Sequence, residues 1–238
     1  MIYLFDVDGT LTPPRQPMRD SFAEKFSIFL QNNICYVVSG SDIKKLKEQL
    51  PQNILEGFKG TFCSMGNEFF IGENCIYSNI IELDNNLLAD LENFRSITKY
   101  PHKLFPNYIE KRVGMVNFSA LGRDCSAEDR DKYYEWDLAN KERESIKDYL
   151  SNKYPAYDIS VGGQISIDIT LKGKGKEQAV KYLRDNYYPK EKIVFCGDKI
   201  NEGGNDYFIA KYCLENDTNA IVIEVKTPEQ LLEDLYKK

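Results

Sequence analysis

Residues 2–12 read Ile-Tyr-Leu-Phe-Asp-Val-Asp-Gly-Thr-Leu-Thr, an apolar run that ends on the carboxylates of Asp6 and Asp8. An apolar run of this length is typical of a buried strand. In a parallel α/β sheet, ligands bind beyond the carboxyl ends of the strands, which is where these side chains would lie. Buried carboxylates repel each other and lose their hydration, and a hard divalent cation offsets both costs. The stretch therefore predicts a Mg²⁺-dependent phosphoryl-transfer site; the alternative interpretation is a turn that caps a helix.

The composition indicates a globular protein of one large or two moderate domains, because the chain has 238 residues and is 42% hydrophobic. Its net charge of −6 argues against nucleic acid as a partner, since phosphate backbones attract basic surfaces. No stretch approaches the ~18 apolar residues of a membrane span. Asp6 and Asp8 stand where a signal peptide would be basic and then apolar. We therefore expect a cytoplasmic protein without a membrane or nucleic-acid partner.

The cysteines are dispersed and show no Cys-x-x-Cys spacing. They are Cys35, Cys63, Cys75, Cys125, Cys196 and Cys213. Most stand in apolar runs, so we expect reduced thiols in the core, with a metal or disulfide role as the alternative. Because His102 is the only histidine, acid and base chemistry is expected from carboxylates.

The two ends of the chain alternate between strands and helices. Further buried strands are predicted over 35–38, 192–196 and 220–225, and helices over 20–32, 43–50, 174–186 and from a cap at Thr227 to Leu235. Short runs between residues 60 and 77 predict a hairpin on the flank of the sheet. Strands separated by helices predict a doubly wound, Rossmann-like parallel sheet of the α/β class.

The middle of the chain has a different pattern. The predicted order is a helix over 87–97, strands over 108–112 and 115–119, one long helix over 127–150, and strands over 158–161 and 164–171. Trp136 and Tyr149 are expected in the core of this segment. Strands that follow one another without a crossover helix predict an antiparallel sheet. We therefore expect residues 82–174 to form an α+β domain inserted into a core made of residues 1–81 and 175–238.

Ser39 and Gly40 follow the strand predicted over 35–38. A hydroxyl at that point can donate to a phosphoryl oxygen beside the amides of a helix start. Ser41 could share or take this role, and Ser41 or Asp42 could also be a plain helix cap.

Together, the side chains that follow the predicted strands suit phosphoryl chemistry. They are Asp6, Asp8, Ser39, Asp198 and Asp206, with Lys176 at the start of a helix. The carboxyl ends of parallel strands converge, so we expect these side chains to meet. A cation offsets the carboxylates, while Lys and Ser offset the phosphoryl oxygens. One aspartate is then free to attack phosphorus and form an aspartyl phosphate.

Four motifs occur in the order found in one phosphotransferase superfamily. They are Asp6-Val7-Asp8-Gly9-Thr10, Ser39, Lys176, and Gly197-Asp198 with Gly203-Gly204-Asn205-Asp206. The chain thus resembles the haloacid dehalogenase superfamily. The resemblance implies that Asp6 is the nucleophile and Asp8 the general acid/base. It also implies Mg²⁺ bound by Asp6, the Asp8 main-chain carbonyl and Asp198, with Asp206 supporting the metal or its waters.

By the same resemblance, Ser39 and Lys176 would hold the transferring phosphoryl group. One stretch departs from the family, which has a further Asp and Thr after Gly-Gly-Asn-Asp that help to hold a second cation. Residues 207–212 read Tyr-Phe-Ile-Ala-Lys-Tyr instead, which leaves a second cation site open.

The inserted segment carries a second group of motifs. They are Arg112-Val113-Gly114-Met115-Val116-Asn117, Leu121-Gly122-Arg123-Asp124-Cys125-Ser126, Glu128-Asp129-Arg130 and Gly162-Gly163-Gln164-Ile165-Ser166-Ile167-Asp168. They look like the cap of eukaryotic-type phosphomannomutases, whose opening Thr12-Pro13-Pro14-Arg15-Gln16 also matches. The implied substrate-binding residues are Arg15, Arg112, Arg123, Arg130, Ser166 and Asp168. The cap arginines would bind the substrate's phosphate, with Arg15 assisting from the core, and Ser166 and Asp168 would contact phosphate and sugar hydroxyls.

Physical reasoning agrees with this role for the arginines, because guanidinium forks match phosphate oxygens. Surface ion pairs with nearby Asp and Glu are the alternative for the cap arginines, and a solvated charge is the alternative for Arg15.

The expected function is interconversion of mannose 6-phosphate and mannose 1-phosphate, which would supply GDP-mannose synthesis. A mutase must return the phosphoryl group to a sugar phosphate, so it needs a separate phosphate anchor. The reaction implies a hexose 1,6-bisphosphate as intermediate and activator. The alternatives are a capped sugar phosphatase, a phosphoglucomutase-like activity and a non-enzymatic binding module. The resemblance also implies a homodimer through the cap.

Overall fold

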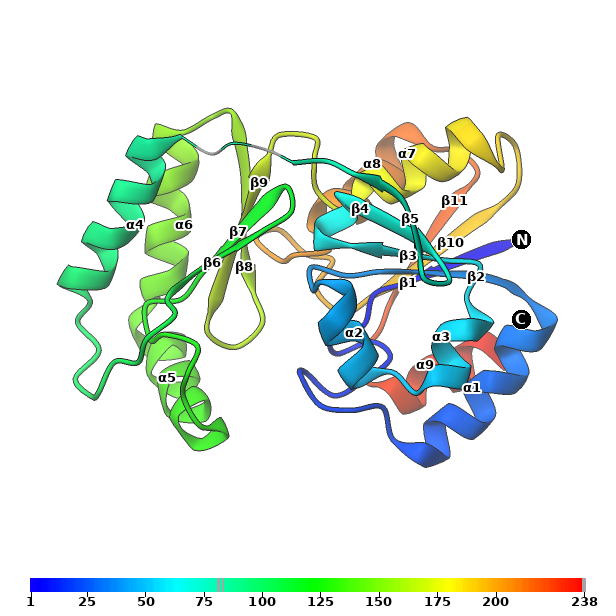
Figure 1. The fold of residues 1–238 in the computed structure, drawn as a ribbon, viewed down its shortest axis with the longest axis horizontal. Helices are drawn as coiled ribbons and strands as arrows, with labels where there is room; N and C mark the ends of the chain where they lie inside the picture. Colours follow the sequence, from blue (N-terminus) through cyan, green and yellow to red (C-terminus); the bar gives the residue numbers. More distant parts are fainter. Residues whose placement is uncertain (81, 83, 237–238) are drawn as a thin grey trace. The chain divides into compact units, whose positions relative to one another are not determined.

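The computed structural model describes residues 1–80, 82 and 84–236. The chain divides into two compact units (Figure 1). Unit 1 contains residues 1–79, 174–202 and the segment from residue 206 onward, and unit 2 contains residues 80–173 and 203–205. The expected boundary at residues 81 and 82 includes Ile81, which lies outside the described residues.

In the described part of unit 1, seven strands form one sheet in the order β11-β10-β1-β2-β3-β4-β5. They are β1 (Ile2–Phe5), β2 (Ile34–Val38), β3 (Gly60–Cys63), β4 (Glu68–Ile71), β5 (Asn74–Ser78), β10 (Ile193–Gly197) and β11 (Ala220–Glu224). The first five strands in this order pair in parallel, and β4 and β5 add an antiparallel hairpin at one edge. The flanking hairpin predicted from the sequence is therefore confirmed.

Strand β1 lies in the middle of this sheet, and its apolar run packs against helices on both faces. Tyr3 and Phe5 belong to one buried cluster, whereas Ile2 and Leu4 belong to another. The first cluster includes side chains of α1 (Asp20–Asn32), α2 (Ile43–Gln49), α3 (Gln52–Gly57) and α9 (Pro228–Tyr236). The second includes side chains of α7 (Glu177–Asn186) and α8 (Tyr207–Asn216). Because alternate residues of a strand point to opposite faces, this pattern confirms the predicted doubly wound α/β sheet.

Two helices of unit 1 begin directly after residues that the sequence indicates as helix caps. The Asp42 carboxylate accepts a hydrogen bond from the backbone N–H of Lys45, and the Thr227 hydroxyl accepts one from Gln230. Helix α3 was not predicted, because its six residues bury a single apolar side chain, Ile54. Six residues are too short for a helical period to show in the sequence.

Unit 2 has a four-stranded antiparallel sheet in the order β6-β7-β9-β8. The strands are β6 (Ile109–Arg112), β7 (Met115–Phe118), β8 (Tyr157–Gly162) and β9 (Ser166–Leu171). One face packs on α4 (Asn85–Ile97), α5 (Ala127–Asn140) and α6 (Glu142–Lys153), through a cluster that includes Leu91, Tyr133 and Ile146 (Figure 1). The described residues of this unit therefore form an α+β fold, in which one layer of helices packs on one sheet. This agrees with the antiparallel pattern of the sequence.

The single long helix predicted over 127–150 is wrong, because the chain forms α5 and α6 with a break at Lys141. Lys141 has φ +57°, in the left-handed region, and its N–H donates to the carbonyl oxygen of Asp137. The Asp137 carboxylate then accepts hydrogen bonds from the backbone N–H and the Nε of Arg143. Asp137 therefore accepts hydrogen bonds both at the end of α5 and at the start of α6. A periodic apolar pattern does not reveal these contacts.

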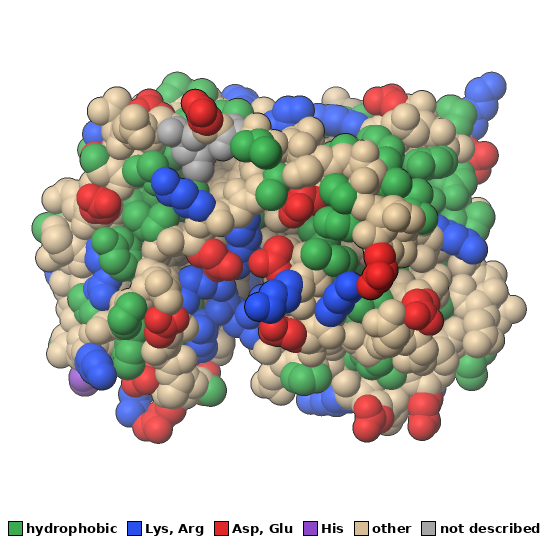
Figure 2. Space-filling model, viewed as in Figure 1, with side chains coloured by type: hydrophobic (Ala, Val, Ile, Leu, Met, Phe, Trp, Pro, Cys, Tyr) green, Lys and Arg blue, Asp and Glu red, His purple; other side chains and the backbone are tan. Residues whose placement is uncertain are grey.

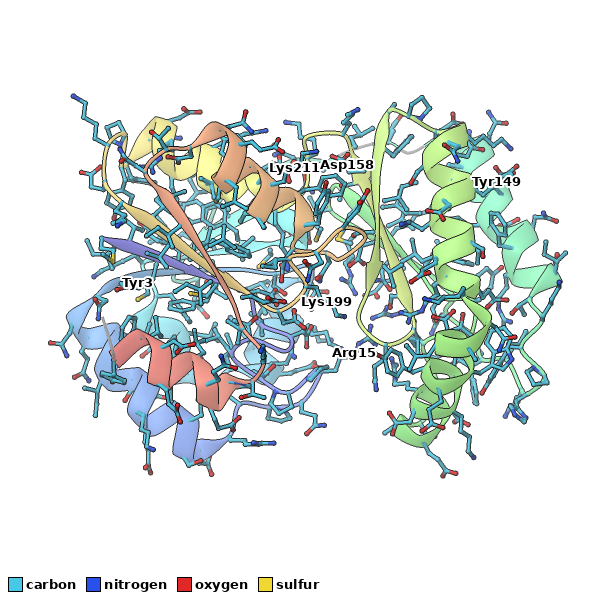
Figure 3. The ribbon with its side chains drawn as sticks, turned by 180° about the vertical axis from the view of Figure 1, so that it is seen from behind. Tyr3, Arg15, Tyr149, Asp158, Lys199 and Lys211 are labelled. Carbon is cyan, nitrogen blue, oxygen red and sulfur yellow. The ribbon has the colours of Figure 1, made fainter. Side chains whose placement is uncertain are left out.

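Tyr149 of α6 is also not a core residue, since 47% of its surface is exposed. Its ring points away from the sheet toward α4 (Figure 3), where it meets the ring of Phe94 edge to face. Trp136 is partly buried against the core of unit 2. A helical spacing of three residues thus identified the apolar face but not its limit.

All six cysteines are reduced and lie outside disulfides. Cys35, Cys63, Cys196 and Cys213 are buried as expected, but Cys75 is exposed and Cys125 is half-buried. Among the described helices, none is long and apolar enough to cross a membrane.

Candidate active site

Three aspartates of unit 1 form an acidic cluster at the carboxyl edge of its sheet. Asp6 directly follows β1, Asp198 directly follows β10, and Asp206 directly precedes α8. Each offers a carboxylate oxygen, and these oxygens all lie within 4.8 Å of one another. Arg15 and Lys199, on the loops after β1 and β10, lie at this edge, whereas Tyr3 marks the other end of β1 (Figure 3). Three of the predicted site residues therefore meet as expected.

Lys176 is the buried cation of this cluster. Its Nζ lies 2.6 Å from Oδ1 of Asp6 and 2.6 Å from Oδ1 of Asp206. Burial alone would lower the pKa of Lys176, but the charges of Asp206 and Asp6 outweigh it and raise that pKa above its usual value. Lys176 is therefore a fixed ammonium group beside the proposed nucleophile.

The cluster still carries an excess of negative charge, because three carboxylates face one ammonium group. Burial, followed by the charge of Asp206, raises the pKa of Asp6 well above its usual value despite Lys176. The same two causes raise the pKa of Asp198 to about 6. Oδ1 of Asp198 is buried and has no hydrogen-bond partner among the described residues. Carboxylate oxygens in this state are ligands that suit a divalent cation such as Mg²⁺.

Gly9 is what lets Asp198 come this close to the first strand. A Cβ at Gly9 would lie 2.3 Å from Oδ2 of Asp198, and the backbone of Gly9 has φ +91°. Both conditions exclude a larger residue at this position. The glycine of the Asp-x-Asp-Gly motif therefore shapes the acidic cluster.

Asp8 does not belong to the three-carboxylate cluster, and its side chain is held in another way. Its Oδ1 accepts a hydrogen bond of 2.6 Å from the backbone N–H of Arg15 and one of 2.8 Å from Nε2 of Gln49. Arg15 itself has φ +59°. Gln49 is 3% exposed. Its role could not be predicted from the sequence, because it lies on a short amphipathic helix.

Ser39 directly follows β2, and it is 2% exposed. Its Oγ accepts a hydrogen bond from the backbone N–H of Ser41, so its own hydroxyl hydrogen can point elsewhere. The carbonyl oxygen of Ser39 accepts a hydrogen bond from the N–H of Met65, which fixes the backbone of the loop after β2. Ser41 is 6% exposed, and the choice between the two hydroxyls stays a prediction.

The phosphate-binding residues predicted in the middle of the chain all lie in unit 2. Nη2 of Arg112 and Nε of Arg123 each lie 2.7 Å from the same oxygen, Oε2 of Glu110. The side chains of Arg112 and Arg123 are only 7% and 11% exposed. These are ion pairs, as the alternative interpretation held, but they are not surface ion pairs.

Arg130, near the start of α5, is the third arginine of this group. Its Nη2 donates to the carbonyl oxygen of Arg123, and its Nη1 is buried without a hydrogen-bond partner among the residues that the structure describes. Burial lowers the pKa of Arg130, and the charge of Arg123 adds to this effect. A buried N–H of a guanidinium is a ready donor to an anion. Lys and Arg side chains gather over the four-stranded sheet of this unit (Figure 2).

Asp168 and Ser166 lie on β9 and are 6% and 1% exposed. Oδ1 of Asp168 accepts a hydrogen bond from Nδ2 of Asn117, and Oδ1 of Asn117 in turn accepts one from Nη1 of Arg123. Gly162 makes room for the carboxylate, since a Cβ there would lie 2.4 Å from Oδ2 of Asp168. The hydrogen bonds therefore connect Arg123 with Asp168 through Asn117.

The predicted site residues thus form one group in each unit. Unit 1 brings together Asp6, Lys176, Asp198 and Asp206, and it also contains Asp8, Arg15 and Ser39. Unit 2 brings together Arg112, Arg123, Arg130 and Asp168, and it also contains Ser166. The sequence did not predict Gln49, Glu110 or the role of Asn117. For Glu110 and Asn117 a signal existed, because strand alternation places both on the face of Arg112.

The parallel sheet of unit 1, with Asp6, Lys176, Asp198 and Asp206 at its carboxyl edge, has the arrangement of the haloacid dehalogenase fold. The structure is similar to that of a haloacid dehalogenase subclass IIB sugar phosphatase, with a TM-score of 0.60 and 16% identity, covering 99% of this chain and 98% of that one. It is also similar to the IMP-nucleotidase of Plasmodium falciparum, with a TM-score of 0.62 and 16% identity, covering 100% of this chain and 68% of that one. At such identities the likeness concerns the fold.

A family model described as "Eukaryotic phosphomannomutase" matches residues 23–237. The chain is 36% identical to a phosphomannomutase of Spinacia oleracea over 88% of its own length and 86% of that protein. It is 32% identical to phosphomannomutase 1 of Dictyostelium discoideum, over 100% of this chain and 97% of that one. The chain belongs to the eukaryotic phosphomannomutase family. The resemblance inferred from the motifs is therefore confirmed, and the family is one of enzymes.

Proposed function

We propose that this protein interconverts mannose 6-phosphate and mannose 1-phosphate through a phosphoryl group carried on Asp6. Membership of the eukaryotic phosphomannomutase family supports the substrate class. The observation that carries the proposal is the buried arginine set beside Asp168 in unit 2. A phosphatase needs a site only for the phosphate that it removes, whereas a mutase must also hold a phosphate that stays on the sugar.

In the proposed first half-reaction, a carboxylate oxygen of Asp6 attacks phosphorus and the bond to the sugar oxygen breaks. Asp8 gives its proton to that sugar oxygen as general acid. Gln49 and the N–H of Arg15 support this role, because they hold the Asp8 carboxyl in one orientation. The products are an aspartyl phosphate and a sugar hydroxyl.

In the second half-reaction, a hydroxyl of a sugar phosphate loses its proton to Asp8 and attacks the phosphorus of the aspartyl phosphate. The carboxylate of Asp6 leaves, and a hexose 1,6-bisphosphate forms. The ammonium group of Lys176, held at 2.6 Å from Asp6, and the hydroxyl of Ser39 would bind the phosphoryl oxygens during both transfers. A hexose 1,6-bisphosphate added from outside would phosphorylate Asp6 and act as the activator.

The acidic cluster supports a Mg²⁺ site, and its unsatisfied Asp198 oxygen is the observation behind that fit. Asp6, the main-chain carbonyl of Asp8 and Asp198 would hold the ion, with Asp206 in support. Bound there, Mg²⁺ would neutralise charge on the transferring phosphoryl group.

We further propose that unit 1 is the catalytic core and unit 2 is a cap that binds the sugar phosphate. Arg112, Arg123 and Arg130 would bind the phosphate that stays on the sugar, with Arg15 assisting, while Ser166 and Asp168 would contact phosphate and sugar hydroxyls. The proposal includes a cytoplasmic homodimer through the cap, whose product supplies GDP-mannose synthesis.

The proposed function is tested by incubating the protein with Mg²⁺, mannose 1-phosphate and a catalytic amount of hexose 1,6-bisphosphate. Mannose 6-phosphate should accumulate, and an Asp6→Asn variant should form none. Inorganic phosphate without mannose 6-phosphate would show a sugar phosphatase instead. Unchanged turnover in Asp6→Asn would show that Asp6 is not the nucleophile.

A further inference from the structure

Four polar side chains form a row across the sheet of unit 2, one from each strand. Glu110 on β6 lies opposite Asn117 on β7, Asn117 lies opposite Asp168 on β9, and Asp168 lies opposite Ser160 on β8. Directly opposite residues share one face of a sheet. The other face carries apolar residues such as Val116 and Ile167, which pack in the core of the unit. The row is therefore the centre of the polar face.

Side-chain contacts link this row to the arginines. Oε2 of Glu110 lies 2.7 Å from both Nη2 of Arg112 and Nε of Arg123. Asn117 accepts a hydrogen bond from Nη1 of Arg123 and donates one to Oδ1 of Asp168. A continuous chain of contacts thus runs from Arg112 through Glu110, Arg123 and Asn117 to Asp168.

Each link in this chain has a defined direction. The Asn117 amide can only place its oxygen toward the arginine and its nitrogen toward the carboxylate, because a guanidinium only donates and a carboxylate only accepts. Asn117 is 4% exposed, so water does not compete for its hydrogen bonds and the amide keeps one orientation. Glu110 uses one oxygen for two guanidiniums, which sets the distance between them.

The energetic consequence concerns the arginines before a ligand arrives. An arginine side chain has many rotamers, and an unordered side chain would lose this entropy on binding a ligand. When protein contacts have already ordered the side chain, that loss no longer weakens binding. Ordered guanidiniums also keep phosphate and sugar hydroxyl contacts at a fixed separation.

We propose that Glu110 and Asn117 are positioning residues of the sugar phosphate site: Glu110 sets the two arginines for the phosphate, and Asn117 fixes the separation between Arg123 and Asp168. This inference rests on the proposed function, which assigns the phosphate to the arginines and sugar hydroxyls to Asp168. Neither Glu110 nor Asn117 touches the substrate in this role. Both act through the residues that they hold.

The Glu110 test compares Glu110→Ala with Glu110→Gln in the mutase reaction, with Lys111→Ala on the same strand as control. The KM for mannose 1-phosphate should rise about tenfold in Glu110→Ala, equivalent to about 1.4 kcal/mol. Glu110→Gln keeps an acceptor oxygen and should recover part of that loss, while kcat changes less than about twofold. Lys111 is exposed and its variant should match the unsubstituted protein.

Two outcomes would overturn the role of Glu110. A lower KM in both variants would mean that Glu110 only repels the phosphate. A fall in kcat with unchanged KM, or a fall in stability alone, would mean that it only supports the fold. Failure of the proposed function looks different, because the unsubstituted protein would then form no mannose 6-phosphate from mannose 1-phosphate.

The Asn117 test uses sugar selectivity. Asn117→Ala should reduce the ratio of kcat/KM for mannose 1-phosphate over glucose 1-phosphate, or its inverse, whichever sugar the unsubstituted protein prefers. Asn117→Asp should reduce it at least as much, because a second carboxylate repels Asp168. An unchanged selectivity ratio in both variants, with folded protein shown by circular dichroism, would overturn the role of Asn117.

Discussion

Nζ of Lys176 lies 2.6 Å from Oδ1 of Asp6, although the two residues are 170 positions apart in the chain. Both side chains are almost completely buried, with 0% and 2% exposure. Burying an ion pair is costly unless each charge keeps its partner. The pair therefore ties the first strand to the start of α7 and also prepares the site for an anion.

The first prediction concerns the stability that this pair provides. Lys176→Met should lower the free energy of unfolding by about 3–5 kcal/mol, because Asp6 and Asp206 lose their buried cation. Urea unfolding followed by circular dichroism measures the change. Lys44→Met, at an exposed position of α2, is the matched control. Equal stabilities of the two variants would contradict the buried ion pair.

The second prediction concerns the divalent cation. Mg²⁺ at about 100 times its Kd should stabilise the folded protein by about 2.7 kcal/mol. Asp198→Asn should lose this stabilisation, because it removes the carboxylate with the unsatisfied oxygen. Asp185→Asn, at an exposed position of α7, should keep it. The readout is the unfolding midpoint with Mg²⁺ and with chelator, and equal Mg²⁺ responses in Asp198→Asn and Asp185→Asn would argue against the site.

The third prediction concerns Gln49 and the orientation of Asp8. Nε2 of Gln49 donates to Asp8, but its Oε1 is buried without a hydrogen-bond partner within residues 1–80, 82 and 84–236. An unsatisfied buried acceptor costs about 1–3 kcal/mol, so Gln49→Leu should lose little or no stability. Its kcat should nevertheless fall about tenfold, as expected when a general acid is less well placed.

Steady-state kinetics and urea unfolding on the same preparation test this separation of stability from activity. Gln52→Leu, at an exposed position of α3, controls for the loss of a glutamine amide. Loss of stability in proportion to activity would mean that Gln49 is simply a core residue.

The fourth prediction concerns the break between α5 and α6. Lys141 adopts φ +57°, which costs an ordinary residue roughly 1–2 kcal/mol relative to glycine. Lys141→Gly should therefore raise the free energy of unfolding by about 0.5–1 kcal/mol, after the entropy that glycine adds to the unfolded chain. Lys141→Ala removes the same side chain without relieving the backbone and should give no gain. A gain in both variants would point to the lysine charge instead.

Local sequence patterns predict some elements of this fold and conceal others. The apolar run before Asp6 and the caps at Asp42 and Thr227 are local signals, and the structure confirms the elements they predict. The break at Lys141 depends on one carboxylate, Asp137, that serves both helices, so periodicity over the whole stretch concealed it.

The candidate site divides in the same way. Asp6, Asp198 and Asp206 could be brought together from the sequence because parallel strands end at one edge. Lys176 contacts two of these carboxylates, and Gln49 holds Asp8. Both contacts depend on how separate helices pack. Such contacts arise from tertiary structure and leave no mark in local spacing.

In the proposed mechanism, Asp6 carries the phosphoryl group and passes it to a sugar phosphate. The most direct measurement labels the protein with hexose 1,6-bisphosphate that carries radioactive phosphate at both positions, then chases it with unlabelled mannose 1-phosphate. We expect acid-stable label on the peptide that contains Asp6, and its transfer during the chase into hexose bisphosphate and then hexose monophosphate. Label on another peptide, or its release as inorganic phosphate during the chase, would show that Asp6 does not pass a phosphoryl group to a sugar phosphate.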